Sequence, residues 1–447
     1  MVYIITALSV ILIAAIIMVY RWIHLKADLR YPPLANSAIS YPDYPDLKFA
    51  IISDPHFYAR SLGDCGPAFE AYLQTDRKLV KESVELIELA VNEVLQSDAE
   101  VILIPGDLSC EGEMLSHLGM AKALSRLKDN GRRVYVVPGN HDINMLHGAV
   151  SYRGIETEPA ESISAEQFAD IYRDFGYGDA LYRDDYSLSY VASISKRLWL
   201  VAIDTCRYRD NTSDVDHAGS KLTQPFIDWL AGILKKAAEQ GIAVMVMIHH
   251  GVVEHWSGQG KLHPDFLVED HLRFNRFLAL AGVRLAFSGH YHAQDIALAD
   301  YKENGFIYDI ETGSLITPPC PIRYATIEEN KIKIRSVNLI EKLCPGSTFT
   351  EEATAFVQKT LEYQIINTLR KYLVTDQDAQ LLSAYVAKAF LAHLIGDENS
   401  EFKPIFDPSQ LSLWGRLVYA RQKKMIEGLW TNLPPDDLNT TLDLKVR

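Results

Sequence analysis

Cysteine and positive charge are both scarce in this sequence. Only 5 of its 447 residues are cysteine, which is too few, and an odd number, for a disulfide framework. Lysine and arginine total 44 against 58 aspartate and glutamate residues, and the formal net charge is −14. An acidic chain lacks the broad basic surface that non-specific nucleic-acid binding needs, so we expect no such partner. Hydrophobic residues make up 48% of the chain, enough for a full-sized core, which excludes a disordered protein.

Long apolar runs are absent from the sequence except at the N-terminus. Val2 to Tyr20 is uncharged, and at about 1.5 Å per residue it nearly matches the ~30 Å hydrocarbon core of a bilayer. A cleaved signal peptide would carry a basic segment before the run and small residues after it, whereas bulky Tyr20 and Trp22 stand here. We therefore predict an uncleaved transmembrane anchor over residues 1–21.

The orientation of this anchor depends on few charges. Arg21, Lys26 and Arg30 all follow the apolar run, and Asp28 opposes them. The positive-inside rule then favours a cytoplasmic location for the rest of the chain. Three charges do not decide on which side of the membrane the rest of the chain lies.

Three further segments follow the predicted anchor. Residues 22–46 are rich in Pro, Tyr, Asp and Ser, which is typical of an extended linker. Within residues 47–340, short apolar runs such as 47–53 alternate with segments of helical periodicity such as 76–96, which predicts a layered α/β domain. Residues 341–447 carry helical periodicity without strand signals, and they predict a small helical C-terminal domain that could cap the site.

Polar motifs stand at the ends of five predicted strands. These motifs are SDPH, GD, GNHD, HH and GHYH. Sites in open α/β sheets form at the carboxyl ends of strands, so we expect the motifs to meet. In an extended backbone, residues two apart face the same way, which would orient the donors of each D-x-H or H-x-H pair alike. The seven metal donors that the motifs supply are Asp54, His56, Asp107, Asn140, His249, His290 and His292.

This donor set predicts a dinuclear metal centre. Carboxylate and amide oxygens with imidazole nitrogens, and no thiolate, suit divalent or trivalent Mn, Fe or Zn. One carboxylate shared between two ions, with a bridging hydroxide, would complete two coordination shells. Such ions, about 3.5–4 Å apart, acidify bound water and clamp both oxygens of an in-line displacement at phosphorus. The residues alone do not decide whether His249 or its neighbour His250 is the ligand.

The ordered set SDPHF, GDLSCEGE, GNHD, HH and GHYH resembles the signature of the calcineurin-like metallophosphoesterases. The similarity extends over roughly residues 47 to 340. It implies a four-layer α/β/β/α sandwich with the site at the strand ends. The ligands that it implies are Asp54, His56 and His292 for one ion, Asn140, His249 and His290 for the other, and Asp107 as the bridge between them.

The same resemblance implies roles for two further residues. His141 resembles a family histidine that contacts phosphate and protonates the leaving oxygen, and Asp142 would orient it. The sequence departs from the family at Gly251, because relatives often carry prolines after the HH motif. In the loop beyond, His255 and His263 are either contacts for substrate phosphate or solvated side chains.

Stretches such as VYVVPGNHDIN and GYGDALYRDDYSLSY are similar to those of bacterial cyclic-nucleotide phosphodiesterase-like members of the family. These members carry an N-terminal anchor or export segment and a C-terminal helical domain. The resemblance implies a membrane-anchored phosphoesterase that acts on a small-molecule phosphate ester or nucleotide by metal-bridged hydroxide attack. Its leading form is a phosphodiesterase that acts on nucleotides, cyclic nucleotides among them. A phosphomonoesterase, a nucleotide pyrophosphatase or a protein phosphatase could use the same centre. A non-catalytic, metal-stabilised scaffold is the alternative from another class.

Overall fold

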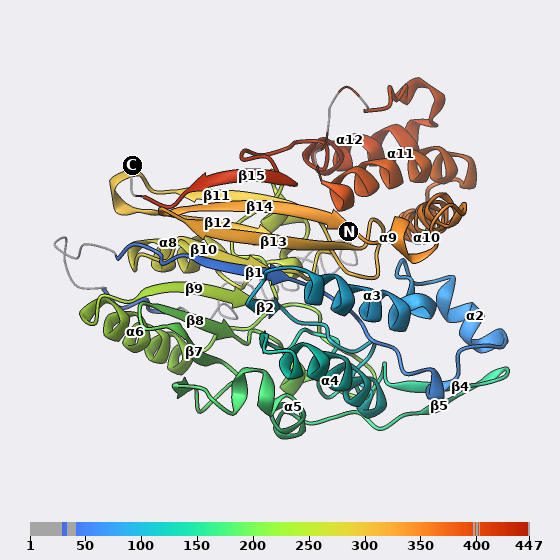
Figure 1. Ribbon diagram of the computed structural model, residues 1–447. Coiled ribbons are helices and arrows are strands. Elements are labelled where there is room, and N and C mark those ends of the chain that lie inside the picture. Colours follow the sequence, from blue (N-terminus) through green and yellow to red (C-terminus); the bar gives the residue numbers. More distant parts are fainter. Residues whose placement is uncertain (1–28, 34–41, 397, 399–400, 402, 446–447) are drawn as a thin grey trace, which may run out of the picture.

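The computed structural model describes residues 29–33, 42–396, 398, 401 and 403–445 (Figure 1). The predicted anchor over residues 1–21 lies outside these residues, and so does most of the predicted linker. Within the described part of the chain, no helix combines the length and the apolar character that a membrane crossing requires.

Two mixed β-sheets form the centre of the molecule (Figure 1). The strands β1, β2 and β3 run parallel in the first sheet, and β8, β9, β10 and β12 run parallel in the second. The order of the first sheet is β15 (Asn439–Asp443), β14 (Lys331–Asn338), β13 (Pro321–Glu328), β1 (Leu47–Ile51), β2 (Val101–Ile104) and β3 (Arg133–Val136). The order of the second is β11 (Asp295–Asp300), β12 (Phe306–Glu311), β10 (Leu285–Ser288), β9 (Ala243–Ile248), β8 (Leu198–Ile203), β7 (Tyr190–Ser195) and β6 (Tyr182–Arg183). A separate hairpin is formed by β4 (Val150–Arg153) and β5 (Glu156–Pro159).

The two sheets pack face to face, and helices lie outside them. Phe49 of β1 meets Phe287 of β10 between the sheets, with ring centroids 5.2 Å apart. Along β9, Met247 faces this shared core, whereas its neighbour Val246 faces a second core under the outer helices, as the alternation of a strand requires. The larger helices are α3 (Ser83–Gln96) and α4 (Met114–Asp129) beside the first sheet, and α6 (Gln224–Glu239) and α8 (His271–Leu280) beside the second. The shorter ones are α2 (Pro67–Leu73), α5 (Ala165–Ile171), α7 (Gln259–Leu262) and α9 (Ile340–Leu343).

The predicted α/β fold with a helical C-terminal region is confirmed. Helices α10 (Phe349–Lys371), α11 (Asp376–Ile395) and α12 (Leu413–Gly428) pack together at one end of the sheets (Figure 1). The expectation that no strand follows residue 341 is wrong, because β15 pairs antiparallel with β14 and places Leu442 opposite Ile332. Its sequence NTTLD contains a single leucine, so it lacks the apolar alternation that reveals a strand.

Candidate metal centre

Five strand ends bring the predicted donors together. The turns after β1, β2 and β3 belong to the first sheet, and those after β9 and β10 belong to the second. Because the sheets pack face to face, their carboxyl ends meet at one place. The donors there, all of them buried, are Asp54, His56, Asp107, Asn140, His249, His290 and His292.

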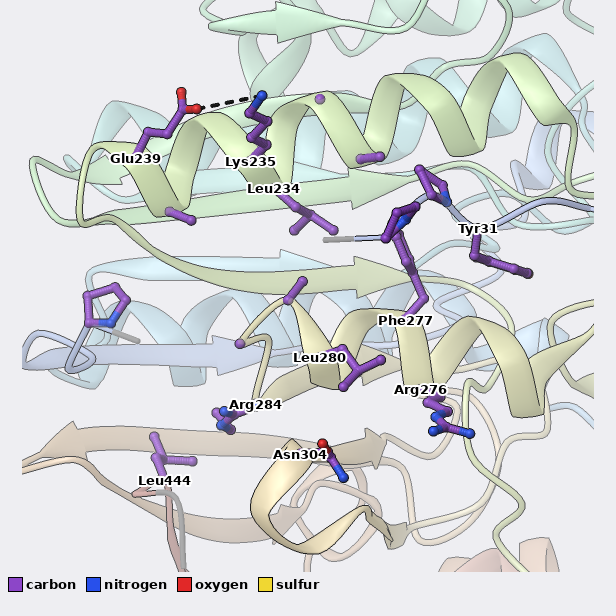
Figure 2. Close-up of a pocket in the computed structure, with 18 of the residues that line it drawn as sticks. Tyr31, Leu234, Lys235, Glu239, Arg276, Phe277, Leu280, Arg284, Asn304 and Leu444 are labelled. Atoms are coloured by element: carbon purple, nitrogen blue, oxygen red, sulfur yellow. Dashed lines mark ion pairs between the residues drawn. The ribbon is translucent and has the colours of Figure 1, made fainter. Parts of the chain in front are cut away.

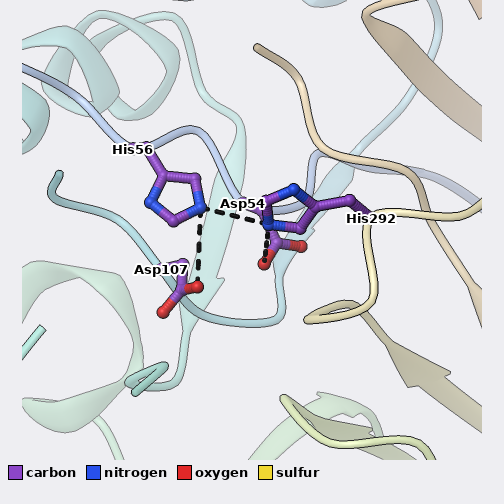
Figure 3. Close-up of side chains that lie close together, drawn as sticks. All are labelled: Asp54, His56, Asp107 and His292. Atoms are coloured by element: carbon purple, nitrogen blue, oxygen red, sulfur yellow. Dashed lines mark hydrogen bonds and ion pairs between the residues drawn. The ribbon is translucent and has the colours of Figure 1, made fainter. Parts of the chain in front are cut away.

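The first donor cluster consists of Asp54, His56, Asp107 and His292 (Figure 3). One ligand atom from each lies within 4.8 Å of all the others. His56 Nε2 lies 3.2 Å from His292 Nε2 and 3.5 Å from Asp107 Oδ2. His292 Nε2 also lies 3.6 Å from Asp54 Oδ1. Two imidazole nitrogens and two carboxylate oxygens therefore converge, as first-row transition metals require.

The second donor cluster shares Asp107 with the first. Asp107, His249 and His290 offer ligand atoms within 4.8 Å of one another. His249 Nε2 lies 3.5 Å from Asp107 Oδ1 and 3.0 Å from the amide oxygen of Asn140. The two oxygens of Asp107 thus face different clusters, Oδ2 toward His56 and Oδ1 toward His249. This arrangement suits a carboxylate that bridges two ions.

The electrostatics of the two clusters favour cations. Burial lowers the pKa of His56, His290 and His292 well below the usual value, which keeps these imidazoles in the neutral form that binds metal. Burial, together with the charge of Asp107, raises the pKa of Asp54. The Oδ2 atom of Asp107 is buried without a hydrogen-bond partner. A metal ion would satisfy this oxygen and relieve the repulsion between the carboxylates, so the donor set fits two ions.

The backbone is left-handed at five of the donors. The φ angle is 47° at Asp54, 39° at His56, 51° at Asp107, 73° at His290 and 68° at His292. The extended conformation expected for the D-x-H and H-x-H pairs is therefore wrong. Residues other than glycine rarely adopt such angles, which cost about 1–3 kcal/mol each. The surrounding structure must hold these turns in place, as is common at functional sites.

Two glycines make room for the carboxylates. A Cβ atom at Gly139 would lie 2.1 Å from Asp107 Oδ1, and one at Gly289 would lie 2.3 Å from Asp54 Oδ2. A side chain at either position would displace a donor. This close approach is the physical reason for the glycines of the GNHD and GHYH motifs.

The carboxylate that contacts His141 belongs to Glu111. His141 Nδ1 lies 2.9 Å from Glu111 Oε2. The carboxylate of Asp142 instead accepts hydrogen bonds from three backbone N–H groups in the turns after β2 and β3. Asp142 therefore braces the turn that carries Asp107, and the expectation that it orients the imidazole of His141 is wrong in this structure. Glu111 was not predicted as a site residue, although it lies inside the GDLSCEGE motif.

The two histidines of the HH motif have different contacts in the structure. His250 is engaged at both ring nitrogens, because Nδ1 lies 2.7 Å from Thr205 Oγ1 and Nε2 lies 2.9 Å from the carbonyl oxygen of Ala218. His249 is the member of the pair that lies beside Asp107.

The two histidines of the following loop have structural contacts. His255 is 0% exposed, and its Nδ1 lies 2.7 Å from Asp295 Oδ1, so the expectation of a substrate contact or a solvated side chain is wrong for this residue. His263 Nδ1 lies 3.2 Å from Tyr291 Oη, and its ring stacks on Phe390 of α11. The loop thus connects the metal centre to the C-terminal helices.

Two basic residues near the centre were not foreseen. Lys78 is 5% exposed, and its Nζ lies 3.3 Å from Asp76 Oδ2. Burial is the main cause of the lowered pKa of both His56 and His292. The second largest cause is the positive charge of Lys78 at His56 and that of Arg77 at His292. Neither basic residue follows an apolar strand, so no pattern in the sequence indicates that it lies near the metal centre.

A small cavity opens at the metal centre. Its volume is about 360 Å³, and small-ligand sites typically measure roughly 300–1,000 Å³. It is lined by Asn140, His141 and Glu111 together with the aromatic rings of Tyr72 and Tyr152. A larger cavity of about 1590 Å³ lies against α6 and α8 (Figure 2), and none of the seven donors lines it.

Comparison with known proteins identifies one matching family model. This model, described as calcineurin-like phosphoesterase, matches residues 47–294, more than half of the chain. No curated protein matches the sequence.

Several solved structures are distantly similar to this chain. A dimetal phosphatase from Danio rerio has 15% identity and a TM-score of 0.45, over 66% of this chain and 97% of that one. A purple acid phosphatase from yellow lupin (Lupinus luteus) seeds has 11% identity and a TM-score of 0.36, over 67% of this chain and 53% of that one. A 5'-nucleotidase precursor from Thermus thermophilus has 12% identity and a TM-score of 0.37, over 72% of this chain and 60% of that one. These similarities are too distant to carry an argument about substrate.

Proposed function

Because this chain belongs to the calcineurin-like phosphoesterase family, whose members are metal-dependent phosphoester hydrolases with a dinuclear centre, we propose that it cleaves phosphodiesters of small nucleotides, cyclic nucleotides among them. The family, the enzyme class and the two-metal cofactor predicted from the sequence are confirmed. The two-ion centre on which this proposal rests is supported by one observation: the carboxylate of Asp107 faces both donor clusters. This arrangement of the two oxygens suits two ions and not one.

We assign the donors to two ions, for which Mn, Fe and Zn are all suitable. When bound, such ions acidify a water molecule and neutralise charge on the phosphoryl oxygens. The buried cation of Lys78 adds positive charge that is felt at His56. In this assignment the first ion would be held by Asp54, His56 and His292, the second by Asn140, His249 and His290, and both by Asp107.

His141 is placed to donate a proton to the leaving oxygen. It lines the cavity at the donors, and Glu111 holds its Nδ1. Burial lowers the pKa of His141, but the carboxylates of Glu111 and Asp107 outweigh this effect and raise the pKa to about 9. A general acid must carry a proton, and the carboxylate of Glu111 at Nδ1 favours the protonated imidazole.

The cavity supports a nucleotide as the substrate. Tyr72 and Tyr152 line it, with ring centroids 5.6 Å apart. Aromatic faces are the usual platform for a nucleobase. The cavity volume of about 360 Å³ suits a small ligand better than a folded protein.

A substrate panel tests this proposal. The full chain, purified with Mn²⁺, is assayed with cyclic nucleotides, bis(p-nitrophenyl) phosphate, nucleotide diphosphates, p-nitrophenyl phosphate and a phosphorylated protein. We expect the highest kcat/KM with the cyclic nucleotides. A preference for the monoester would assign a phosphomonoesterase, and a preference for the diphosphates a nucleotide pyrophosphatase. Activity on phosphoproteins alone would assign a protein phosphatase, and no turnover at all would favour a scaffold.

Glu111→Gln should lower kcat by about 10–100-fold, the usual effect of removing a partner that orients a ligand or catalytic side chain. The amide keeps the shape of the side chain but removes the negative charge beside His141 Nδ1. KM should change little, because Glu111 acts through the proton donor.

The leaving group distinguishes this role from a structural one. The loss should be larger for an alkyl ester than for a p-nitrophenyl ester, since p-nitrophenolate leaves without protonation. Glu161→Gln, at an exposed position, is the matched control. Equal losses with both esters would contradict the positioning role of Glu111.

We further propose that residues 1–21 anchor the chain in a membrane, on the evidence of the apolar run from Val2 to Tyr20. The lysine and arginine bias after it favours a cytoplasmic site. The membranes from which the enzyme is prepared for the substrate panel can also be used to test the anchor. Activity of the full chain should stay with membranes after an alkaline carbonate wash, and activity that is released by the wash would contradict the anchor.

A further inference from the structure

A second buried group of titratable side chains lies where the seven-stranded sheet meets the C-terminal helices. We call it the junction cluster. It shares no residue with the donors of the dinuclear centre. Its members, all nearly inaccessible to solvent, are the carboxylates Asp295, Asp309, Glu311, Glu398 and Asp437 and the imidazoles His255 and His393.

Asp295, at the start of β11, lies between the two histidines. Its Oδ1 is 2.7 Å from His255 Nδ1, and its Oδ2 is 3.7 Å from His393 Nδ1. The other ring nitrogen of His255 lies 3.3 Å from Asp309 Oδ2 and 3.4 Å from Glu311 Oε2. His255 therefore holds one oxygen of Asp295 and leaves the other directed toward His393.

The end of α11 brings the remaining two groups to Asp295. His393 lies in the last turn of α11, and its Nδ1 contacts the Oε1 atom of Glu398. The helix ends at Ile395, and at its C-cap Gly396 φ is 84° and a Cβ atom would lie 2.5 Å from the carbonyl oxygen of Gln294. This close approach sets the helix end directly against the chain that leads into β11. As a result, ligand atoms of Asp295, His393 and Glu398 lie within 4.8 Å of one another.

The junction cluster is short of positive charge. Five carboxylates are opposed by two imidazoles and by Arg323, whose guanidinium donates to the backbone oxygen of Glu311 at 2.8 Å. With all five carboxylates ionised and both imidazoles protonated, these described side chains would carry two negative charges. An uncompensated buried charge costs several kcal/mol. Burial and the charge of Asp295 raise the pKa of Glu311 and of Asp437 to about 8 each, which reflects the same shortage.

Hydrogen bonds do not satisfy all polar atoms of the cluster. Glu398 Oε2 and His255 Nε2 are buried and have no hydrogen-bond partner. Glu398 is 4% exposed and His255 is 0% exposed, so bulk solvent does not reach these atoms. An unpartnered carboxylate oxygen on a residue that already meets an imidazole and a second carboxylate is typical of a metal ligand.

We propose that Asp295, His393 and Glu398 bind a third divalent transition-metal ion, which joins the C-terminal helices to the phosphoesterase sheet. Two carboxylates and one imidazole suit Mn²⁺, Fe²⁺ or Zn²⁺. The ion would supply positive charge in place of protons on the carboxyl groups, and it would bind the free oxygen of Glu398. Its ligands come from β11 and from the end of α11, so it stabilises the packing between these parts of the chain.

Metal content tests the site. The full chain is stripped with a chelator, loaded with Mn²⁺, freed of excess ion by gel filtration and analysed by mass spectrometry for metal. We expect Glu398→Gln, which keeps the shape of the side chain, to hold one Mn²⁺ ion fewer per chain than the unmodified protein. Glu427→Gln, an exposed position on α12 that pairs with Lys423, is the matched control and should lose no ion.

Anomalous diffraction gives an answer that depends on no variant. Crystals of the unmodified protein grown with Mn²⁺ should show a peak among Asp295, His393 and Glu398. Peaks at the dinuclear centre alone, or equal Mn²⁺ content in Glu398→Gln and the unmodified protein, would overturn the third site and show that protons neutralise the cluster. Both measurements count metal and not turnover, so a wrong assignment of substrate would leave them unaffected.

Discussion

Chelation of divalent metal should reduce hydrolysis of bis(p-nitrophenyl) phosphate by at least about 10³-fold, because the ions supply several kcal/mol of transition-state stabilisation. The donors themselves support this expectation. The imidazoles at the centre are held neutral by burial, and an Asp107 oxygen has no hydrogen-bond partner. None of these groups can replace the charge of the ions. Adding Mn²⁺ to the stripped protein should restore the rate.

The control for chelation is the same chelator saturated with Mn²⁺ before it is added. It should leave the rate unchanged, which excludes direct inhibition by the chelator. The melting temperature should fall on stripping and rise again on reloading, since ions that bind only the folded state stabilise it. Full activity of protein shown to contain no metal would contradict the mechanism.

Asp107→Asn should be among the most damaging single substitutions, with a loss in kcat/KM of about 10³-fold. Asp107 is the one donor with an oxygen toward each cluster, Oδ2 near His56 and Oδ1 near His249. The asparagine side chain has the same shape, but it presents an NH₂ group to one of the two ions and carries no charge. Both the affinity for metal and the spacing of the ions should suffer. The measurement is kcat/KM together with bound metal per chain.

Asp98→Asn is the matched control for this variant. It makes the same chemical change at an exposed side chain that pairs with Lys48. Such surface ion pairs contribute about 0–1 kcal/mol, so this variant should keep its activity and its metal. Similar losses in the two variants would mean that Asp107 is not the bridging donor.

The donor motifs could be predicted because each lies within a few residues of the end of an apolar strand. The structure brings all seven predicted donors together. Their backbone conformation could not be predicted in the same way. The spacing of Asp54 and His56 suggested an extended backbone, whereas both residues have positive φ angles. Strained turns of this kind are imposed by the surrounding packing and not by local preference.

Contacts between residues that are far apart in the sequence account for most of the wrong predictions. Asp142 follows His141 directly, yet Glu111 makes the contact with its imidazole. His255 lies in a loop beside the HH motif, yet it is buried against Asp295. The strand β15 completes the first sheet from the far end of the chain. A truncation after residue 341 would therefore remove part of that sheet along with the helices.

The sequence by itself determined the family, the α/β architecture and the candidate metal donors. It could do so because a buried strand and the motif at its end are adjacent in the chain, and their pattern is visible over a few residues. Only the tertiary structure decided which oxygen of Asp107 faces which imidazole, which histidine of the HH motif lies at the centre, and which carboxylates gather around His255 and His393. These choices depend on how two sheets and a helical region pack, and packing joins residues that are far apart in the sequence.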